Sequence, residues 1–139
     1  MINDQIAAPG AAHRLALRVY YEDTDFSGFV YHASYLRFLE RGRTEWLRER
    51  GFHQGAMAET SLAFVVRRLE IDYRKPARMD DIVTVETSAS SPGAASMRFS
   101  QAIMREDAVI VAAEVLVVAV RDGVPVRMSV EMRARLGSR

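Results

Sequence analysis

Residues 18–43, RVYYEDTDFSGFVYHASYLRFLERGR, contain the changes of pattern that decide the fold. Residues 18–22 alternate between two faces as a β-strand does, and residues 23–28 are rich in the Asp, Thr, Ser and Gly that form tight loops. A helical pattern begins near His32. Because the first N–H groups of a helix have no partner within it, this strand, loop and helix start can hold a carboxylate beside free backbone donors.

Two carboxylates, Asp23 and Asp25, stand in the polar loop. Asp25 precedes His32 by seven residues and can therefore face a carbonyl group that is held against the helix start. A carboxylate in that position can act as a nucleophile or as the base that activates water. The residues alone leave a second interpretation open, in which both aspartates only organise the loop by accepting backbone hydrogen bonds in Asx turns.

The residues around Asp25 have a chemical and a structural interpretation. The backbone N–H of His32 can polarise a carbonyl at the helix start, and its imidazole can orient water or Asp25, cap the helix or line a subunit interface. Gly28 permits a turn of the backbone close to a ligand, or is a plain loop glycine. Tyr31 and Tyr35 either line an acyl pocket or belong to the core with their hydroxyls at its rim.

The chain on both sides of this loop predicts one strand and one long helix. Residues 15–21 form the strand, and residues 33–50 form a helix with a common apolar side made by Leu36, Leu39, Trp46 and Leu47. Gly42, in the middle of the helix, lets it lie close against a sheet, and Gly51 ends it. Glu40–Arg43 and Glu45–Arg48 are possible ion pairs on the solvated side.

The second half of the sequence predicts consecutive antiparallel strands at residues 62–73, 81–87, 97–105 and 109–120. Residues 65, 67, 69, 71 and 73 should share the buried face of the first of these. The last run is apolar on both faces and should be internal to the sheet. Asp122-Gly123 indicates a hairpin, and Pro125 limits any strand after it to an edge of the sheet. The fold class is therefore α+β, with about five antiparallel strands wrapped around one helix.

Composition restricts the classes of function. The 139 residues, 49% hydrophobic and 27% charged, predict a single domain over residues 1–139, with residues 1–13 as a flexible tail. The net charge of +1 argues against nucleic-acid binding. There is no cysteine, and the three histidines are isolated, so we expect no metal site. The longest apolar run, residues 109–120, is too short to span a bilayer, while peripheral membrane association stays open. A cytoplasmic location is the default expectation.

Residues 18–43 closely resemble the signature of the 4-hydroxybenzoyl-CoA thioesterase family of hotdog-fold proteins. The resemblance rests on the run Tyr21-Glu22-Asp23-Thr24-Asp25, followed by Gly28, Val30, Tyr31, His32 and Tyr35. The sequence of this stretch is most similar to that of the branch of acyl-CoA thioesterases associated with the Tol-Pal system. Similarity continues through residues 63–67, 76–81 and 113–118, and so covers roughly residues 15–120. Phe26, Ser27 and Phe29 occupy positions that vary in the family.

This resemblance implies a hotdog fold, a homo-oligomer (a dimer at least, or a tetramer) and sites between subunits. It implies hydrolysis of an acyl-CoA thioester to a carboxylic acid and free coenzyme A, with acyl carrier protein as another possible thiol carrier. The catalytic carboxylate of the family falls on Asp25, and the oxyanion donor on the helix start at His32. Coenzyme A is part of the substrate, and no metal or redox cofactor is implied.

Two other functions remain open from the sequence. A hydroxyacyl-thioester dehydratase would use the same fold, but it typically pairs a histidine with a carboxylate from a different segment. A non-catalytic acyl-binding or envelope-associated interaction protein would keep the fold without turnover. The loop sequence argues against the first, and the presence of Asp25, Gly28 and His32 argues against the second.

Overall fold

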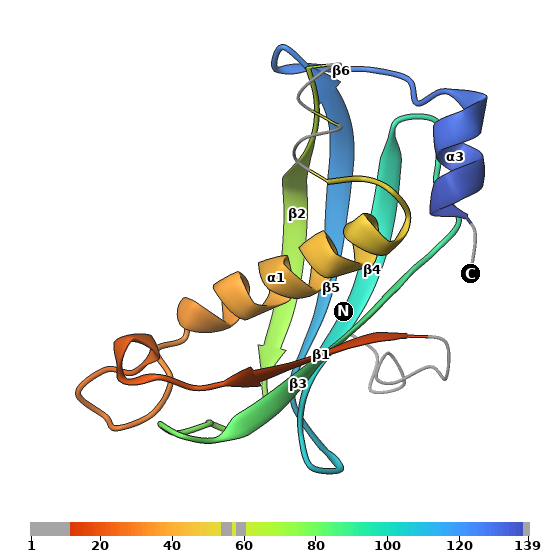
Figure 1. Cartoon of the computed structure of the whole chain (residues 1–139). Helices are drawn as coiled ribbons and strands as arrows, with labels where there is room; N and C mark the ends of the chain where they lie inside the picture. Colours follow the sequence, from red (N-terminus) through yellow and green to blue (C-terminus); the bar gives the residue numbers. More distant parts are fainter. Residues whose placement is uncertain (1–11, 54–56, 58–60, 138–139) are drawn as a thin grey trace.

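The computed structural model describes residues 12–53, 57 and 61–137, which form an antiparallel sheet with a long helix across one face (Figure 1). The strand order is β1-β3-β4-β5-β2, and a short β6 pairs with β5. The sheet thus has six strands, the five long ones that the sequence predicts and β6. The elements in chain order are β1 (His13–Arg18), α1 (Ser34–Glu49), β2 (Leu62–Tyr73), β3 (Ile82–Ala89), β4 (Ser96–Arg105), β5 (Ala108–Arg121), β6 (Val124–Pro125) and α3 (Val130–Leu136).

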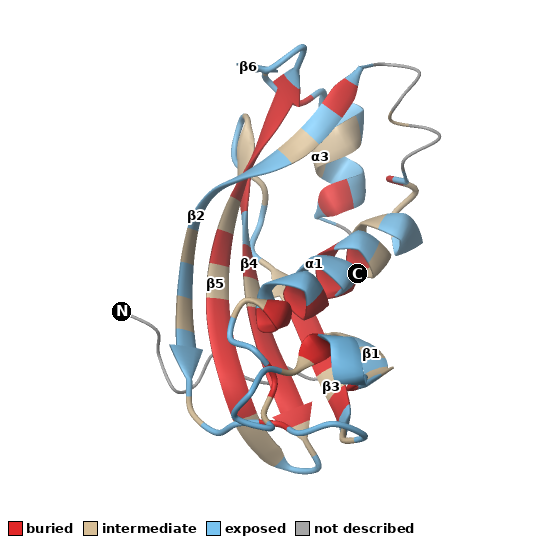
Figure 2. Cartoon of the chain, turned by 90° about the vertical axis from the view of Figure 1, so that its left-hand side faces the viewer, coloured by how far each residue is buried: buried red, intermediate tan, exposed pale blue. Residues whose placement is uncertain are grey.

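The core lies between α1 and the face of the sheet that it crosses. Alternate residues of the inner strands point to that face, so that Val85, Ile103 and Val111 stand side by side in neighbouring strands and are completely buried. Figure 2 shows β4 and β5 buried along most of their length, whereas β2, at the edge, is largely exposed or half-buried. The internal position predicted for residues 109–120 is confirmed by β5.

Helix α1 lies unusually close to the sheet because it has a glycine at the contact. A Cβ atom added at Gly42 would lie 2.6 Å from Val85 Cγ1 and 2.7 Å from Thr87 Oγ1, which is closer than real Cβ atoms approach. The buried side of α1 differs in part from the predicted one. Leu36 is exposed, and the residues that are buried are Ser34, Tyr35, Phe38, Leu39, Gly42, Arg43 and Trp46.

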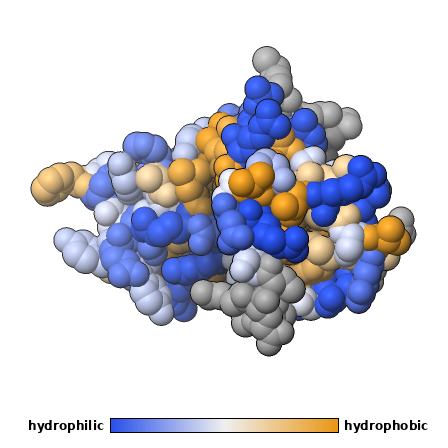
Figure 3. All heavy atoms as spheres, turned by 90° about the horizontal axis from the view of Figure 1, so that it is seen from above, coloured by the Kyte–Doolittle hydropathy of each residue, from blue (hydrophilic) through white to orange (hydrophobic). Residues whose placement is uncertain are grey.

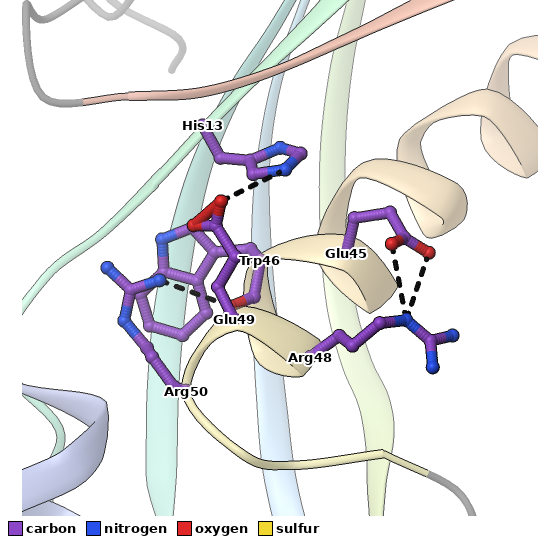
Figure 4. Close-up of polar contacts among 6 residues, drawn as sticks. All are labelled: His13, Glu45, Trp46, Arg48, Glu49 and Arg50. Carbon is purple, nitrogen blue, oxygen red and sulfur yellow. Dashed lines mark hydrogen bonds and ion pairs between the residues drawn. The ribbon is translucent and has the colours of Figure 1, made fainter.

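The C-terminal end of α1 is fixed by its own backbone and by contacts with distant segments. Gly51, at φ +85°, lets the N–H of Phe52 reach the carbonyl of Leu47 at 2.9 Å, which ends the helix as predicted. Figure 4 shows the side-chain contacts there: Arg50 stacks on Trp46, Arg48 pairs with Glu45 at 3.2 Å, and His13 of β1 lies 3.6 Å from Glu49. The start of β1 thereby contacts the end of α1.

Two predictions about β1 and the chain before it are wrong at their boundaries. The expected strand 15–21 ends at Arg18, because residues 21–23 form a 3₁₀ turn instead. The expected tail 1–13 is too long, since His13 already belongs to β1; residues 1–11 lie outside the described residues.

The buried face predicted for residues 65, 67, 69, 71 and 73 is correct for Leu69 and Ile71 but wrong at residues 65 and 67, because β2 contains a β-bulge. Its register against β5 shifts between Val66 and Arg68, so one extra residue reverses the faces. Leu62 and Phe64 therefore share the helix side with Leu69 and Ile71, and Val65 is 44% exposed.

The chain beyond β5 forms two elements. Asp122 (φ +53°) and Gly123 (φ +81°) make the predicted hairpin turn, and Pro125 belongs to the two-residue edge strand β6. Helix α3 was not predicted; it packs Leu136 into the core cluster that contains Trp46 and Phe52. In the part of the chain that the structure describes, no helix has the length and apolar character needed to cross a membrane.

Candidate active site

The polar loop before α1 is a small hairpin. Thr24 bridges to Val30, Tyr31 N–H donates to the carbonyl of Asp23 at 2.8 Å, and Asp25 N–H donates to the carbonyl of Phe29 at 3.1 Å. Residues 26–28 form its tip, where Gly28 N–H donates to the carbonyl of Asp25 at 3.0 Å. The hairpin leads directly into α1 (Figure 1). Asp25 comes directly before its tip and is exposed.

Asp25 is exposed, and one of its oxygens is tightly held. Its Oδ1 accepts hydrogen bonds from the hydroxyl of Ser27 and from Ser27 N–H, the latter at 2.8 Å. These two donors, first the hydroxyl and then the N–H, hold the pKa of the Asp25 carboxyl below its usual value, and the charge of His32 acts in the same direction. Asp25 is consequently a carboxylate at neutral pH, with Oδ2 directed to no hydrogen-bond donor among the described residues.

Asp23 has a different environment. It is buried, and its Oδ2 accepts a hydrogen bond from Tyr20 N–H at 2.8 Å, while Oδ1 lies 3.7 Å from Arg37 of α1. The carboxylate thus ties the 3₁₀ turn to the first part of the helix. This is a loop-organising role, which the sequence left open for both aspartates, although it caps the 3₁₀ turn instead of forming an Asx turn. Asp25 does form an Asx turn, with Ser27.

His32 lies two residues before the first residue of α1. Among the described residues its backbone N–H donates to no acceptor, and the same holds for the N–H of Ala33, whereas the N–H groups of Tyr31 and Ser34 both donate. Its carbonyl accepts a hydrogen bond from the Tyr73 hydroxyl at 3.1 Å, and its exposed imidazole packs edge-on against Tyr31 at 4.6 Å. The helix start therefore offers a free donor whose neighbouring peptide is anchored to the end of β2.

A cavity of about 230 Å³ opens beside His32. It is lined by Val30, His32, Tyr35, Tyr73, Arg74, Lys75 and Pro76. Tyr35 is buried within it, and its hydroxyl accepts a hydrogen bond from Ala77 N–H at 2.9 Å. Burial raises the pKa of Tyr35, so this hydroxyl stays neutral. A second cavity, of about 360 Å³ and mainly apolar, lies at the other end of α1 around Phe52 and Phe64.

Gly28 and Tyr31, the other two predicted site residues, do not line the cavity beside His32. Gly28 has φ +84°, a conformation that favours glycine, but a Cβ there would meet no atom within 4 Å. Tyr31 is 44% exposed and contacts the His32 ring outside the cavity lining. At the end of the molecule where Figure 1 places the hairpin, Figure 3 shows a protruding apolar tip, and Phe26 in that hairpin is fully exposed.

Two residues of this region were missed by sequence reasoning. Tyr73 contacts His32 through a hydrogen bond over a separation of 41 residues, and no local pattern could have revealed it. The contact of Ser27 with Asp25 could have been predicted from the sequence, because a serine two residues after an aspartate is suited to an Asx turn. The described residues contain no group of three or more His, Asp or Glu side chains arranged to hold a metal ion.

Comparison with known proteins places this geometry in a family. The model of the thioesterase-like superfamily matches residues 19–136. Acyl-CoA thioester hydrolase YbgC of Escherichia coli O6:H1 is 48% identical over 108 residues, which cover 77% of this chain and 81% of that protein. Acyl-CoA thioesterase YbgC of Haemophilus influenzae is 46% identical over 121 residues, or 85% and 89% of the two chains.

Solved structures agree with the fold. The crystal structure of a probable thioesterase from Bartonella henselae has a TM-score of 0.82 and 40% identity, covering 86% of this chain and 100% of that one. A hypothetical protein from Aquifex aeolicus has a TM-score of 0.84 at 28% identity, with 89% and 98% of the chains covered. The sheet wrapped on one helix is thus the hotdog architecture expected from the sequence.

Proposed function

Because this chain belongs to the thioesterase-like superfamily, we propose that it is an acyl-CoA thioesterase in which Asp25 supplies the reacting carboxylate. The products are a carboxylic acid and free coenzyme A. The observation that carries the proposal is the pairing of an ionised, exposed Asp25 with a free N–H at the start of α1, in a chain 48% identical to an acyl-CoA thioester hydrolase.

The carboxylate acts on the carbonyl carbon of the thioester. Its free oxygen, Oδ2, either attacks that carbon to give an acyl-enzyme anhydride, which water then opens, or removes a proton from the water that attacks. In both routes the carbon–sulfur bond breaks and one water molecule is consumed: its hydroxyl ends in the carboxylic acid and its other proton ends on the sulfur, which leaves as the thiol of coenzyme A. The low pKa of Asp25 keeps the carboxylate ionised and ready for either route.

The start of α1 stabilises the negative charge that develops on the carbonyl oxygen. The His32 N–H donates to no acceptor among the described residues, and the positive end of the helix dipole adds to its effect. The Tyr73 hydroxyl donates a hydrogen bond to the His32 carbonyl and so restrains the peptide that follows the free N–H. The cavity beside His32, with Tyr35 and Tyr73 in its wall, accepts the group attached to the carbonyl.

The proposal includes an oligomer with the site near the subunit boundary. Strand β2 is at the edge of the sheet, and its Val65 and Val66 are 44% and 48% exposed (Figure 2). An edge strand with exposed valines is suited to pairing with a second copy. The resemblance of residues 18–43 supports an association with the Tol-Pal system, and a cytoplasmic location stays the default expectation. We also propose that acyl carrier protein can carry the acyl group in place of coenzyme A. Peripheral contact of the protein with a membrane is part of the same proposal.

The test is hydrolysis of a panel of acyl-CoAs, with detection of free thiol. We expect turnover by the wild type and a loss of about a hundredfold or more in Asp25→Asn, which keeps the shape of the side chain but not its charge. Asp107→Asn, at an exposed turn between β4 and β5, is the matched control and should keep its activity. A folded Asp25→Asn protein with near-native turnover would refute the assignment of the carboxylate. Hydration of an enoyl-CoA without thiol release would favour a dehydratase instead.

A further inference from the structure

We propose that Ser27 is a positioning residue for Asp25, which fixes oxygen Oδ1 and leaves Oδ2 as the oxygen that acts on the substrate. The inference rests on the proposed function of Asp25. Its basis is that both hydrogen bonds to the Asp25 side chain among the described residues come from Ser27, one from the hydroxyl and one from the N–H at 2.8 Å, and both reach Oδ1.

The hydroxyl of Ser27 is itself held in place. Its Oγ accepts a hydrogen bond from Phe29 N–H at 3.2 Å, so its own proton is directed at Asp25. Phe29 in turn accepts from Asp25 N–H at 3.1 Å, and Gly28 N–H donates to the Asp25 carbonyl at 3.0 Å. Residues 25–29 therefore form a closed ring of hydrogen bonds in which the orientation of the carboxylate and the turn of the backbone are coupled.

An exposed carboxylate needs such a restraint. Because the Asp25 side chain is exposed, packing does little to select its rotamer, and a misplacement of about 1 Å at a reacting group can cost about a hundredfold in rate. Two donors on one oxygen make the two carboxylate oxygens unequal, since Oδ1 is engaged and Oδ2 remains available. Asp23 is held differently, by burial and by contacts to both oxygens, which suits an aspartate that has only a structural role.

Few other charges act on Asp25. His32, on the segment that leads into α1, is the titratable residue whose charge lowers the Asp25 pKa in the described part of the chain. Arg78, from the segment that bridges to Phe29, directs its guanidinium over the Phe29 ring, 5.0 Å from its centre. The Ser27 hydroxyl is the first cause of the lowered pKa, so its removal should raise the Asp25 pKa.

Removal of the hydroxyl has two opposed effects on the reaction. A higher pKa makes the carboxylate a somewhat better base or nucleophile, whereas loss of orientation slows the reaction. Because a carboxylate gains little rate from becoming a somewhat stronger base, whereas a misplaced reacting group can cost about a hundredfold in rate, we expect orientation to prevail. The Ser27→Ala variant should lose about tenfold in kcat with a change of KM of about twofold or less.

The experiment compares Ser27→Ala, Ser27→Thr and Thr24→Val in the full chain. Thr24 is the matched control, because its hydroxyl lies in the same hairpin but donates to the Tyr21 carbonyl at 2.7 Å and does not contact Asp25. Steady-state kinetics with an acyl-CoA gives kcat and KM, and an NMR titration of the Asp25 side-chain carboxyl carbon gives its pKa. Circular dichroism at each pH confirms that the variants are folded.

We expect a raised Asp25 pKa and a lowered kcat in Ser27→Ala, rescue of both in Ser27→Thr, and no change of the Asp25 pKa in Thr24→Val. An unchanged kcat and an unchanged Asp25 titration in a folded Ser27→Ala protein would overturn the inference. A changed titration without rescue by threonine would also overturn it. Failure of the proposed function is distinct, because the wild type would then release no thiol while the carboxyl titration would still report on the Ser27 contact.

Discussion

Substitution of Gly42 by alanine tests the close packing of α1 on the sheet. The new Cβ would lie 2.6 Å from Val85 Cγ1, 2.7 Å from Thr87 Oγ1 and 3.1 Å from Gln101 Nε2. Two of these atoms belong to fully buried side chains in inner strands, and the third to a glutamine that is 1% exposed. None is the free end of a flexible surface side chain, so either the helix must move away or the strands must give way.

Two effects of opposite sign decide the change in stability. Alanine favours the helical conformation over glycine by about 1 kcal/mol. Overpacking of a well-packed core costs about 1–3 kcal/mol, and disturbing the 3.0 Å hydrogen bond between Gln101 and Thr87 adds about 1 kcal/mol. The clash should prevail, with a net destabilisation of about 1–3 kcal/mol, which corresponds to a fall in Tm of roughly 3–10 °C for a chain of this size.

The assay is urea denaturation followed by circular dichroism, at a fixed protein concentration so that any assembly affects all variants equally. Arg41→Ala, at the exposed neighbouring position of α1, is the control and should change the free energy of unfolding by about 0.5 kcal/mol or less. If Gly42→Ala were as stable as the wild type or more stable, the helix could not lie as close to β3 as the structure indicates.

Three further predictions address the site and the assembly. His32→Ala keeps the backbone N–H and should lose about tenfold or less in kcat. A thousandfold loss in a folded protein would show that the imidazole, and not the backbone N–H, is the essential group of His32. Light scattering at micromolar concentration should show no monomer, because β2 leaves Val65 and Val66 exposed at a free edge, and a fully active monomer would contradict this. Gly28→Ala should cost about 1–2 kcal/mol of stability from its φ of +84° alone, since no atom lies within 4 Å of the added Cβ; an unchanged urea midpoint would show that the loop adapts.

The features that were predictable from the sequence are those determined by neighbouring residues. The loop before α1 was recognisable because Asp, Thr, Ser and Gly favour turns wherever they occur, and the observed hairpin of residues 23–31 depends on that chemistry. Gly42 and Gly51 were interpreted correctly for the same reason, since a glycine within or after an apolar helix has few physical explanations. The Asp122-Gly123 turn also depends only on the two residues that form it.

The features that were not predictable depend on partners distant in the chain. The bulge in β2 changes which residues face α1, and it is defined only by the register against β5. Helix α3 is seven residues long and is held by packing of Leu136 and by the stacking of Arg135 over Phe52, 4.9 Å from the ring centre. A helix so short has little stability of its own, and its sequence therefore carries a weak signal.

Arg43 shows most clearly how a local pattern can mislead, and its explanation is linked to that of Gly42. An arginine three residues after Glu40 predicts a solvated ion pair. In the structure Arg43 is 9% exposed, burial lowers its pKa, and its Nη1 donates to Gln101 Oε1 at 3.0 Å. Gln101 Nε2 in turn donates to the carbonyl of Leu39 at 2.9 Å, a contact that only a helix close to the sheet can make. Gly42, which allows the helix to lie this close to the sheet, thus also allows Arg43 to reach its buried partner Gln101.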